Sequence, residues 1–155
     1  MIEIKKKWDN ILMLSEDKKE VEFFSSESKV MLDGMDVNFP WEYEKSWILL
    51  EVKDYKWTLF YNISSSGKTI VYIYETKFEL KEEIMSFFGD VDVLIIQGSK
   101  EAVKVFENIE ARVVVPFWEG KEVFLNALGQ HSEAVKSYKV KADMWIDEAT
   151  FVNLA

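Results

Sequence analysis

Two glutamates set among aromatic residues are the first candidates for chemistry. Glu42 and Glu44 lie one residue apart in the segment 35–47, MDVNFPWEYEKSW. Two carboxylates in different environments can act as the acid and the base of one reaction. Alternate residues of an extended segment point the same way, so both carboxylates could instead face water. The aromatic residues of the segment are Phe39, Trp41, Tyr43 and Trp47. We expect a loop held in place by these rings, with its glutamates in solvent, and keep acid–base chemistry as the alternative.

A second motif, SSSGKT at residues 64–69, ends like a phosphate-binding loop. That loop requires a glycine five positions before Gly67, where this chain has Asn62. It also requires a following helix, whereas the next residues, IVYIY, are typical of a strand. We interpret the motif as a hairpin turn.

The composition excludes several kinds of site. The chain has no cysteine, which excludes disulfides and thiolate chemistry, and its single histidine is His131. A histidine without a spaced partner is more typical of a surface or capping residue than of a metal ligand. The formal net charge of −9 repels phosphate groups, so we expect neither nucleic acid nor an anionic membrane as a partner.

Length and patterning indicate one domain spanning residues 1–155. The N-terminus MIEIKKKWDN lacks the apolar core of a signal peptide, so we expect a cytoplasmic protein. The Lys and Glu content without cysteine fits a thermophilic source, although AT-rich coding gives a similar bias.

The first half of the chain alternates apolar and polar residues as strands do. Short strands are predicted within residues 1–33 as an antiparallel meander, and longer ones over residues 48–52, 57–63 and 70–74. On the longer strands Trp57 should share one face with Leu59, Tyr61 and Ile63. Lys5, Lys6 and Lys7 are interpreted as a solvated strand edge.

The second half is organised around the unit 89–118, GDVDVLIIQGSKEAVKVFENIEARVVVPFW. The apolar runs 92–96 and 113–115 predict two buried parallel strands, joined by a helix that Ser99 caps. Pro116 should end the second strand because it has no N–H group. Helices over 78–88 and 121–128 and closing strands over 138–142 and 150–154 complete the prediction. Val123, Phe124, Ala127 and Leu128 should form the inward face of the second of these helices.

Residues 35–136 resemble the metallo-β-lactamase superfamily, in particular its small UlaG-like metal-dependent hydrolases. The resemblance is carried by PWEYE at residues 40–44, GDVDVLII at 89–96 and VVVPFW at 113–118. It implies an α+β or α/β sandwich in which two β-layers are flanked by helices, with the antiparallel meander at the N-terminus.

The departures from that family concern its metal ligands. Members that hydrolyse hold metal through a His-x-His-x-Asp-His motif and later His and Asp residues; this chain has no such motif. The resemblance places Glu75 where a metal-binding Asp would be, Trp118 where a His would be and Trp41 where a Gly would be. The segment that carries the motif is missing, so the resemblance implies a shortened, degenerate member. Indole does not bind zinc, and one carboxylate cannot complete a four-ligand site.

We therefore expect a non-catalytic binding or oligomerisation module without cofactor or metal. Its partner would be a second copy or another protein. The residues expected around the cleft that corresponds to the family's metal site are Trp41, Glu42, Tyr43, Glu44, Tyr74, Glu75 and Trp118. The rings suit a contact with a protein or small ligand, or they simply fill an emptied site. The alternative is a divergent hydrolase that uses Glu75 with Glu42 or Glu44, alone or on a hard ion such as Mg²⁺ or Ca²⁺.

Overall fold

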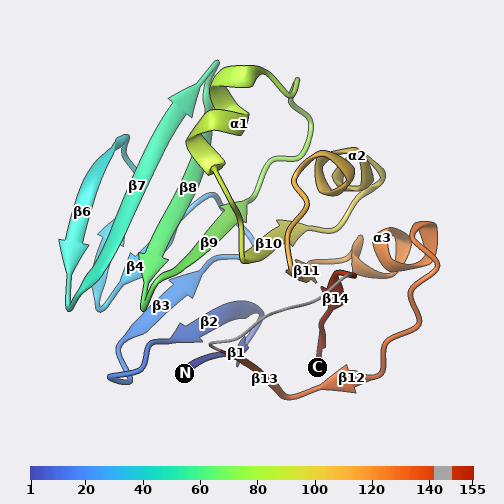
Figure 1. Ribbon diagram of the computed structural model, residues 1–155, viewed down its shortest axis with the longest axis horizontal. Helices are drawn as coiled ribbons and strands as arrows, with labels where there is room; N and C mark the ends of the chain where they lie inside the picture. Colours follow the sequence, from blue (N-terminus) through green and yellow to red (C-terminus); the bar gives the residue numbers. More distant parts are fainter. Residues whose placement is uncertain (142–147) are drawn as a thin grey trace.

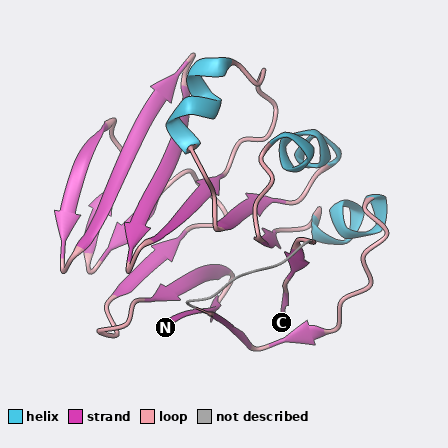
Figure 2. Cartoon of the chain, in the orientation of Figure 1, coloured by secondary structure: helices cyan, strands magenta, loops and turns pink. Residues whose placement is uncertain are grey.

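The chain forms two facing β-sheets with helices on the outer side of one of them (Figures 1 and 2). The computed structural model describes residues 1–141 and 148–155. The two β-layers and the N-terminal meander predicted from the sequence are confirmed. Within the described ranges, no helix is long and apolar enough to cross a membrane.

The six-stranded sheet has the order β13-β1-β2-β3-β4-β5, and every neighbouring pair is antiparallel. Its strands are β1 (Ile2–Lys7), β2 (Asn10–Leu14), β3 (Glu20–Phe23), β4 (Val30–Leu32), β5 (Met35–Val37) and β13 (Ser137–Val140).

The seven-stranded sheet has the order β14-β11-β10-β9-β8-β7-β6. Its strands are β6 (Trp41–Lys45), β7 (Ile48–Tyr55), β8 (Thr58–Ser65), β9 (Lys68–Ile73), β10 (Val93–Gln97), β11 (Val113–Phe117) and β14 (Thr150–Phe151). β6 to β9 are joined by antiparallel hairpins, whereas β9, β10, β11 and β14 run parallel. The remaining elements are α1 (Glu82–Phe88), α2 (Lys100–Asn108), α3 (Lys121–Ala127) and a parallel pair of β12 (Ala134–Val135) with β15 (Asn153–Leu154).

Two hydrophobic cores lie on the two faces of the seven-stranded sheet. Val93 and Ile95 of β10 belong to the core between the sheets, and Leu94 and Ile96 belong to the core under the helices. A strand buried on both faces has to be apolar throughout, and this explains the continuous run in the sequence. Figure 1 shows α1, α2 and α3 on the side of this sheet that faces away from β1, β2 and β3.

The segment 35–47 is not the loop that the sequence suggested. It forms β5 and then β6, the outermost strand of the larger sheet. Trp41, Glu42, Tyr43 and Glu44 alternate as strand residues do, but the strand is only five residues long, follows Pro40 and buries little, so the sequence was interpreted as a loop. Trp57 also departs from the prediction: it occupies a hairpin turn with φ of 70° and is 96% exposed, so it shares no face with Leu59.

Pro116 does not end its strand, because β11 continues to Phe117. The Val114 carbonyl accepts a bond from Val152 on the side of β14, and alternate residues of a strand direct their main-chain groups to the same side. Pro116 therefore faces the side of β14, whose pairing with β11 stops at Val114. The missing N–H falls where no partner strand needs it.

The helices also differ in detail from the prediction. α1 starts at Glu82 and not at residue 78, and Phe78 packs on Phe60 with ring centroids 4.7 Å apart. In α3, Leu125 is buried while Val123 is 46% exposed. The Ser99 cap is confirmed, since its hydroxyl accepts from the Ala102 N–H at 3.0 Å.

The closing strands are shorter than predicted. β13 ends at Val140, and the predicted end at residue 142 lies outside the described residues. The segment 150–154 divides into β14 and β15, which pair with β11 and β12 respectively.

Two glycines hold the turns after β10 and β11 in direct backbone contact. A Cβ atom on Gly98 would lie 2.4 Å from the Lys121 nitrogen, and one on Gly120 would lie 1.9 Å from the Gly98 oxygen. Gly120 has a φ of −79°, which any residue can adopt, so the lack of space and not the backbone conformation requires glycine there.

We expect Gly98→Ala to destabilise the protein by about 3 kcal/mol, because the methyl group must push apart two turns at the ends of buried strands. The free energy of unfolding from urea titration measures this. Gly34→Asn is the control, since Gly34 has a φ of 83° with open space and Asn tolerates that conformation. Equal stability of Gly98→Ala and the wild type would contradict the packing argument.

Candidate functional site

The structure does not bring the seven expected residues into one cleft. Trp41, Glu42, Tyr43 and Glu44 are on β6, whereas Tyr74 and Glu75 follow β9 and Trp118 follows β11. β7 and β8 lie between β6 and β9, a separation of three strand spacings or roughly 14 Å. The chain therefore has two candidate regions, the β6 edge and the ends of the parallel strands.

At the strand ends, Glu75 and Trp118 lie on the same edge of the sheet. Ile73, Ile96 and Pro116 are in register across β9, β10 and β11, so Glu75 and Trp118 follow strand ends that lie two strand spacings, roughly 10 Å, apart. The Glu75 carboxylate accepts from the Lys77 N–H at 2.8 Å, which directs it to its own loop.

Three tyrosines close the space between the sheets beside Glu75. The phenol groups of Tyr61, Tyr72 and Tyr74 donate to main-chain carbonyls of the loop between β3 and β4. The acceptors are Ser28 at 2.9 Å, Phe24, Glu27 at 3.1 Å and Ser26 at 3.0 Å. The loop is thus fixed over the sheet.

Four aromatic rings pack closely against one another in this part of the molecule. Tyr72 lies with its ring centroid 5.3 Å from that of Phe23, 5.1 Å from that of Tyr61 and 5.9 Å from that of Phe117. All four rings are buried. Burial raises the pKa of Tyr61 to about 12 and raises the pKa of Tyr72 well above its usual value.

A cavity of about 400 Å³ remains next to Trp118, between the end of β11 and the turn from β1 to β2. Lys6, Asp9 and Lys121 contribute charged groups to its wall. Sequence reasoning missed them, because Lys6 was assigned to a solvated run. The sequence signal that could have identified Lys6 was its spacing from Ile2 and Ile4, because alternate residues of β1 share the core-facing side.

The β6 edge offers unpaired main-chain groups. Lys45 and Ile48 flank a two-residue turn, so their main-chain groups form a hydrogen-bonded pair. Because hydrogen-bonded pairs alternate along an antiparallel ladder, the main-chain N–H and C=O groups of Tyr43 also point toward β7. The N–H and C=O groups of Glu42 and Glu44 consequently face away from the sheet. No strand within residues 1–141 and 148–155 covers that side.

Three carboxylates accompany this edge. Glu42 lies directly opposite Glu51 of β7, and Glu44 is on the same face. None of the three forms an ion pair with a described lysine or arginine; nearby Lys53 is bound to Glu83 at 2.9 Å. Like charges directly opposite one another destabilise a sheet. The edge is therefore acidic and not neutralised.

The opposite face of β6 is aromatic. Trp41 is 73% exposed and Phe39, just before the strand, is 71% exposed. Tyr43 packs on the core between the sheets, and its hydroxyl donates to the Phe39 carbonyl at 3.1 Å. This bond holds Phe39 beside the strand. Trp41 also lines a groove of about 570 Å³ that continues to Phe87 of α1.

The described residues do not fit a zinc ion. No group of three or more His, Asp or Glu side chains among them is placed to hold a metal. His131 is exposed in the segment between α3 and β12, and Trp118 offers an indole at the strand end.

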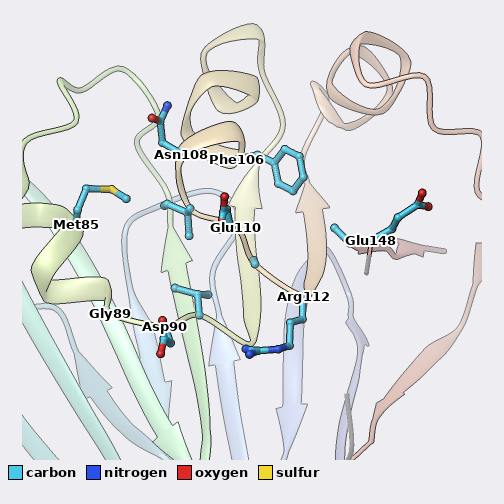
Figure 3. A pocket seen from close by; sticks show the side chains of 12 residues that line it. Met85, Gly89, Asp90, Phe106, Asn108, Glu110, Arg112 and Glu148 are labelled. Atoms are coloured by element: carbon cyan, nitrogen blue, oxygen red, sulfur yellow. The ribbon is translucent and has the colours of Figure 1, made fainter. Parts of the chain in front are cut away.

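Another cavity, of about 660 Å³, lies at the other end of β10 and β11 (Figure 3). The side chains of Asp90, Glu110 and Glu148 make its wall acidic. Its one arginine, Arg112, is bound to the Asp92 carboxylate at 2.9 Å.

No protein-family model matches the sequence, and no curated protein matches it. A solved structure does match the fold. It is a protein from Thermotoga maritima, assigned as a Zn-dependent hydrolase of the metallo-β-lactamase superfamily. The TM-score is 0.73 over 99% of both chains, with 12% sequence identity.

At this identity the match establishes the fold alone. The chain has a metallo-β-lactamase-like fold, and the resemblance seen in the sequence is confirmed at that level. Because 99% of each chain is covered, this chain is not shortened relative to the Thermotoga protein.

The buried phenols predict a loss of stability in base. Their pKa values are higher in the folded protein than the value of about 10 in an unfolded chain, so the folded state holds these protons more tightly. Stability is therefore complete below pH 10 and falls as the pH rises through 12. We expect Tyr61→Phe to remove roughly 2 kcal/mol of that loss, measured by urea unfolding across this range. The same loss in the variant and the wild type would contradict this assignment.

Proposed function

We propose that this chain is a binding module whose β6 edge takes up an extended basic segment of another protein, and that it is not a metal-dependent hydrolase. The observation that carries the proposal is the open edge of β6, which is acidic on one face and aromatic on the other. The replacement of the family's ligand positions by Glu75 and Trp118 supports the second half of the proposal.

The main chain supplies the first part of the recognition. Glu42 and Glu44 each direct an N–H and a C=O outward, and an added antiparallel strand satisfies these groups with its own. Strand addition of this kind gives affinity that does not depend on sequence.

The side chains supply selectivity. In an added strand, the residues opposite Glu42 and Glu44 are two positions apart and point to the same face as the carboxylates. Lysine or arginine at both positions pairs with Glu42 and Glu44 and offsets two of the three negative charges of Glu42, Glu44 and Glu51. The residue between them faces the side of Trp41 and Tyr43, where an apolar group fits. The expected motif is therefore Lys-x-Lys or Arg-x-Arg, with x apolar.

A second copy of the chain is a poorer occupant of the edge. Two-fold pairing of β6 centred on Tyr43 places Glu42 of each copy opposite Glu44 of the other, which adds like-charge pairs to an edge that already has one. The net charge of −9 on each copy also opposes association.

The geometry gives less support to a hydrolase that uses carboxylates. Such an enzyme would need Glu75 beside Glu42 or Glu44, and β7 and β8 separate them.

The test is binding of a labelled peptide, acetyl-Thr-Lys-Val-Lys-Val-Thr-amide, followed by fluorescence anisotropy at low salt. We expect the double variant Glu42→Gln/Glu44→Gln to bind roughly 2- to 30-fold more weakly, because two surface ion pairs are lost. The matched control Glu101→Gln/Glu107→Gln changes the net charge equally on α2 and should bind like the wild type. A peptide with glutamate in place of lysine should not bind.

A backbone variant tests strand addition separately from charge. Glu44→Pro removes an N–H that faces the open edge and leaves the ladder to β7 intact, whereas Glu44→Ala removes only the side chain. We expect the proline variant to bind more weakly than the alanine variant at equal stability. Equal affinity of these two variants, equal affinity for the acidic peptide, or a dimer in sedimentation that Glu44→Pro dissociates would each overturn the proposal.

A further inference from the structure

The cavity beside Trp118 combines apolar walls with two lysines, neither of which forms an ion pair with a described carboxylate. The apolar part of its wall comes from Ile11, Pro116, Phe117, Trp118 and Leu154. Phe117 and Leu154 belong to the core between the sheets, so the cavity is an opening into that core at its edge. A ligand placed here would lose water from its apolar part.

Lys6 reaches the cavity because of its position in β1. It follows Ile2 and Ile4 on the core-facing side and lies directly opposite the buried Ile11 of β2. Its neighbour Lys7 lies on the other face, where it binds Glu22 at 3.2 Å. Lys6 forms no ion pair with any described carboxylate.

Lys121 faces the same space from the start of α3. The Lys121 N–H donates to the Trp118 carbonyl at 3.1 Å, so one tight turn places the ammonium group and the indole at the same opening. Its Nζ donates to the Leu154 carbonyl at 3.0 Å. Burial lowers the pKa of Lys121, and the nearby charge of Lys6 lowers it further. Glu122 opposes this shift in part. The two ammonium groups thus face one cavity and repel each other.

We propose that this cavity binds a small molecule that carries one carboxylate on an apolar or aromatic body. The carboxylate lies between Lys6 and Lys121, where it relieves their repulsion and accepts charge-assisted hydrogen bonds. The body packs on Trp118, Phe117 and Leu154.

The charges of the rim select against more highly charged anions. Asp9 and Glu119 also line the cavity, so its four charged side chains sum to zero. A single carboxylate offsets the repulsion between the lysines, whereas a phosphate dianion would bring excess negative charge near these two acids. The apolar walls offer a phosphate ion nothing to pack against.

The test uses phenylacetate, with phenylacetamide as the neutral isostere and inorganic phosphate as the competing anion. Binding is followed by titration calorimetry and by the NMR signal of the Trp118 indole N–H, which the Trp118→Phe variant assigns. Phenylacetate should bind and shift that signal. Phenylacetamide should bind about tenfold more weakly or not at all, and phosphate should not displace phenylacetate.

Substitution of each lysine by methionine keeps the length of the side chain and removes the charge. Lys6→Met and Lys121→Met should each weaken phenylacetate binding about tenfold. Lys5→Met is the matched control, because Lys5 lies on the other face of β1 and should bind as the wild type does. Lys121→Met also removes the hydrogen bond to the Leu154 carbonyl and can therefore impair folding. Lys6→Met lacks this side effect and keeps the test independent of it.

Several results would overturn the proposal. These are no binding of phenylacetate at millimolar concentration, equal affinity for phenylacetamide, displacement by phosphate, or unchanged binding by Lys6→Met. The site is independent of the β6 edge, so Glu42→Gln/Glu44→Gln should bind phenylacetate normally.

Discussion

The contact between Gly98 and Gly120 is the constraint on which the strand ends depend. The turns after β10 and β11 meet backbone to backbone, with no room for a Cβ atom on either glycine. This contact fixes where α2 and α3 begin relative to the parallel strands. It therefore also fixes Trp118 and Lys121, which lie on either side of Gly120. Without side chains at the contact, the two helices can start close together and cover the same face of the sheet.

Hydrogen bonds between tyrosines and a loop fill the interior between the sheets beside Glu75. Tyr61, Tyr72 and Tyr74 each donate a hydrogen bond to the loop between β3 and β4, so this loop lies directly over the sheet. A buried phenol without an acceptor would be costly, and the loop carbonyls supply the acceptors. The result is an aromatic interior beside Glu75, with a cavity next to Trp118.

Much of the fold could be read from the sequence because burial leaves a periodic pattern. The strands of the meander and the unit from β10 to β11 were predicted on this basis. β6 was missed although Trp41 and Tyr43 alternate with Glu42 and Glu44, because the short aromatic segment after Pro40 was interpreted as a loop. Pro116 was misjudged because strand order decides which N–H groups need partners. Strand order also explains why seven residues expected together lie in two regions. The side of β1 on which Lys6 lies could have been predicted from its alternation with Ile2 and Ile4, but the run of three lysines was interpreted as a whole.

The acidic edge of β6 can serve protection and recognition at once. An open edge invites pairing with any strand, and charge on the edge is a common protection against this. Lysine and glutamate can both protect an edge, but each disfavours a different set of partners. In the proposed function, Glu42, Glu44 and Glu51 disfavour acidic strands, including a second copy of this chain, and favour basic ones. Lysines on this edge would protect less well against pairing between two copies of the protein, because the negative charge of the second copy would attract them. In the proposed function, glutamates therefore oppose pairing between two copies and make the edge selective for a basic segment.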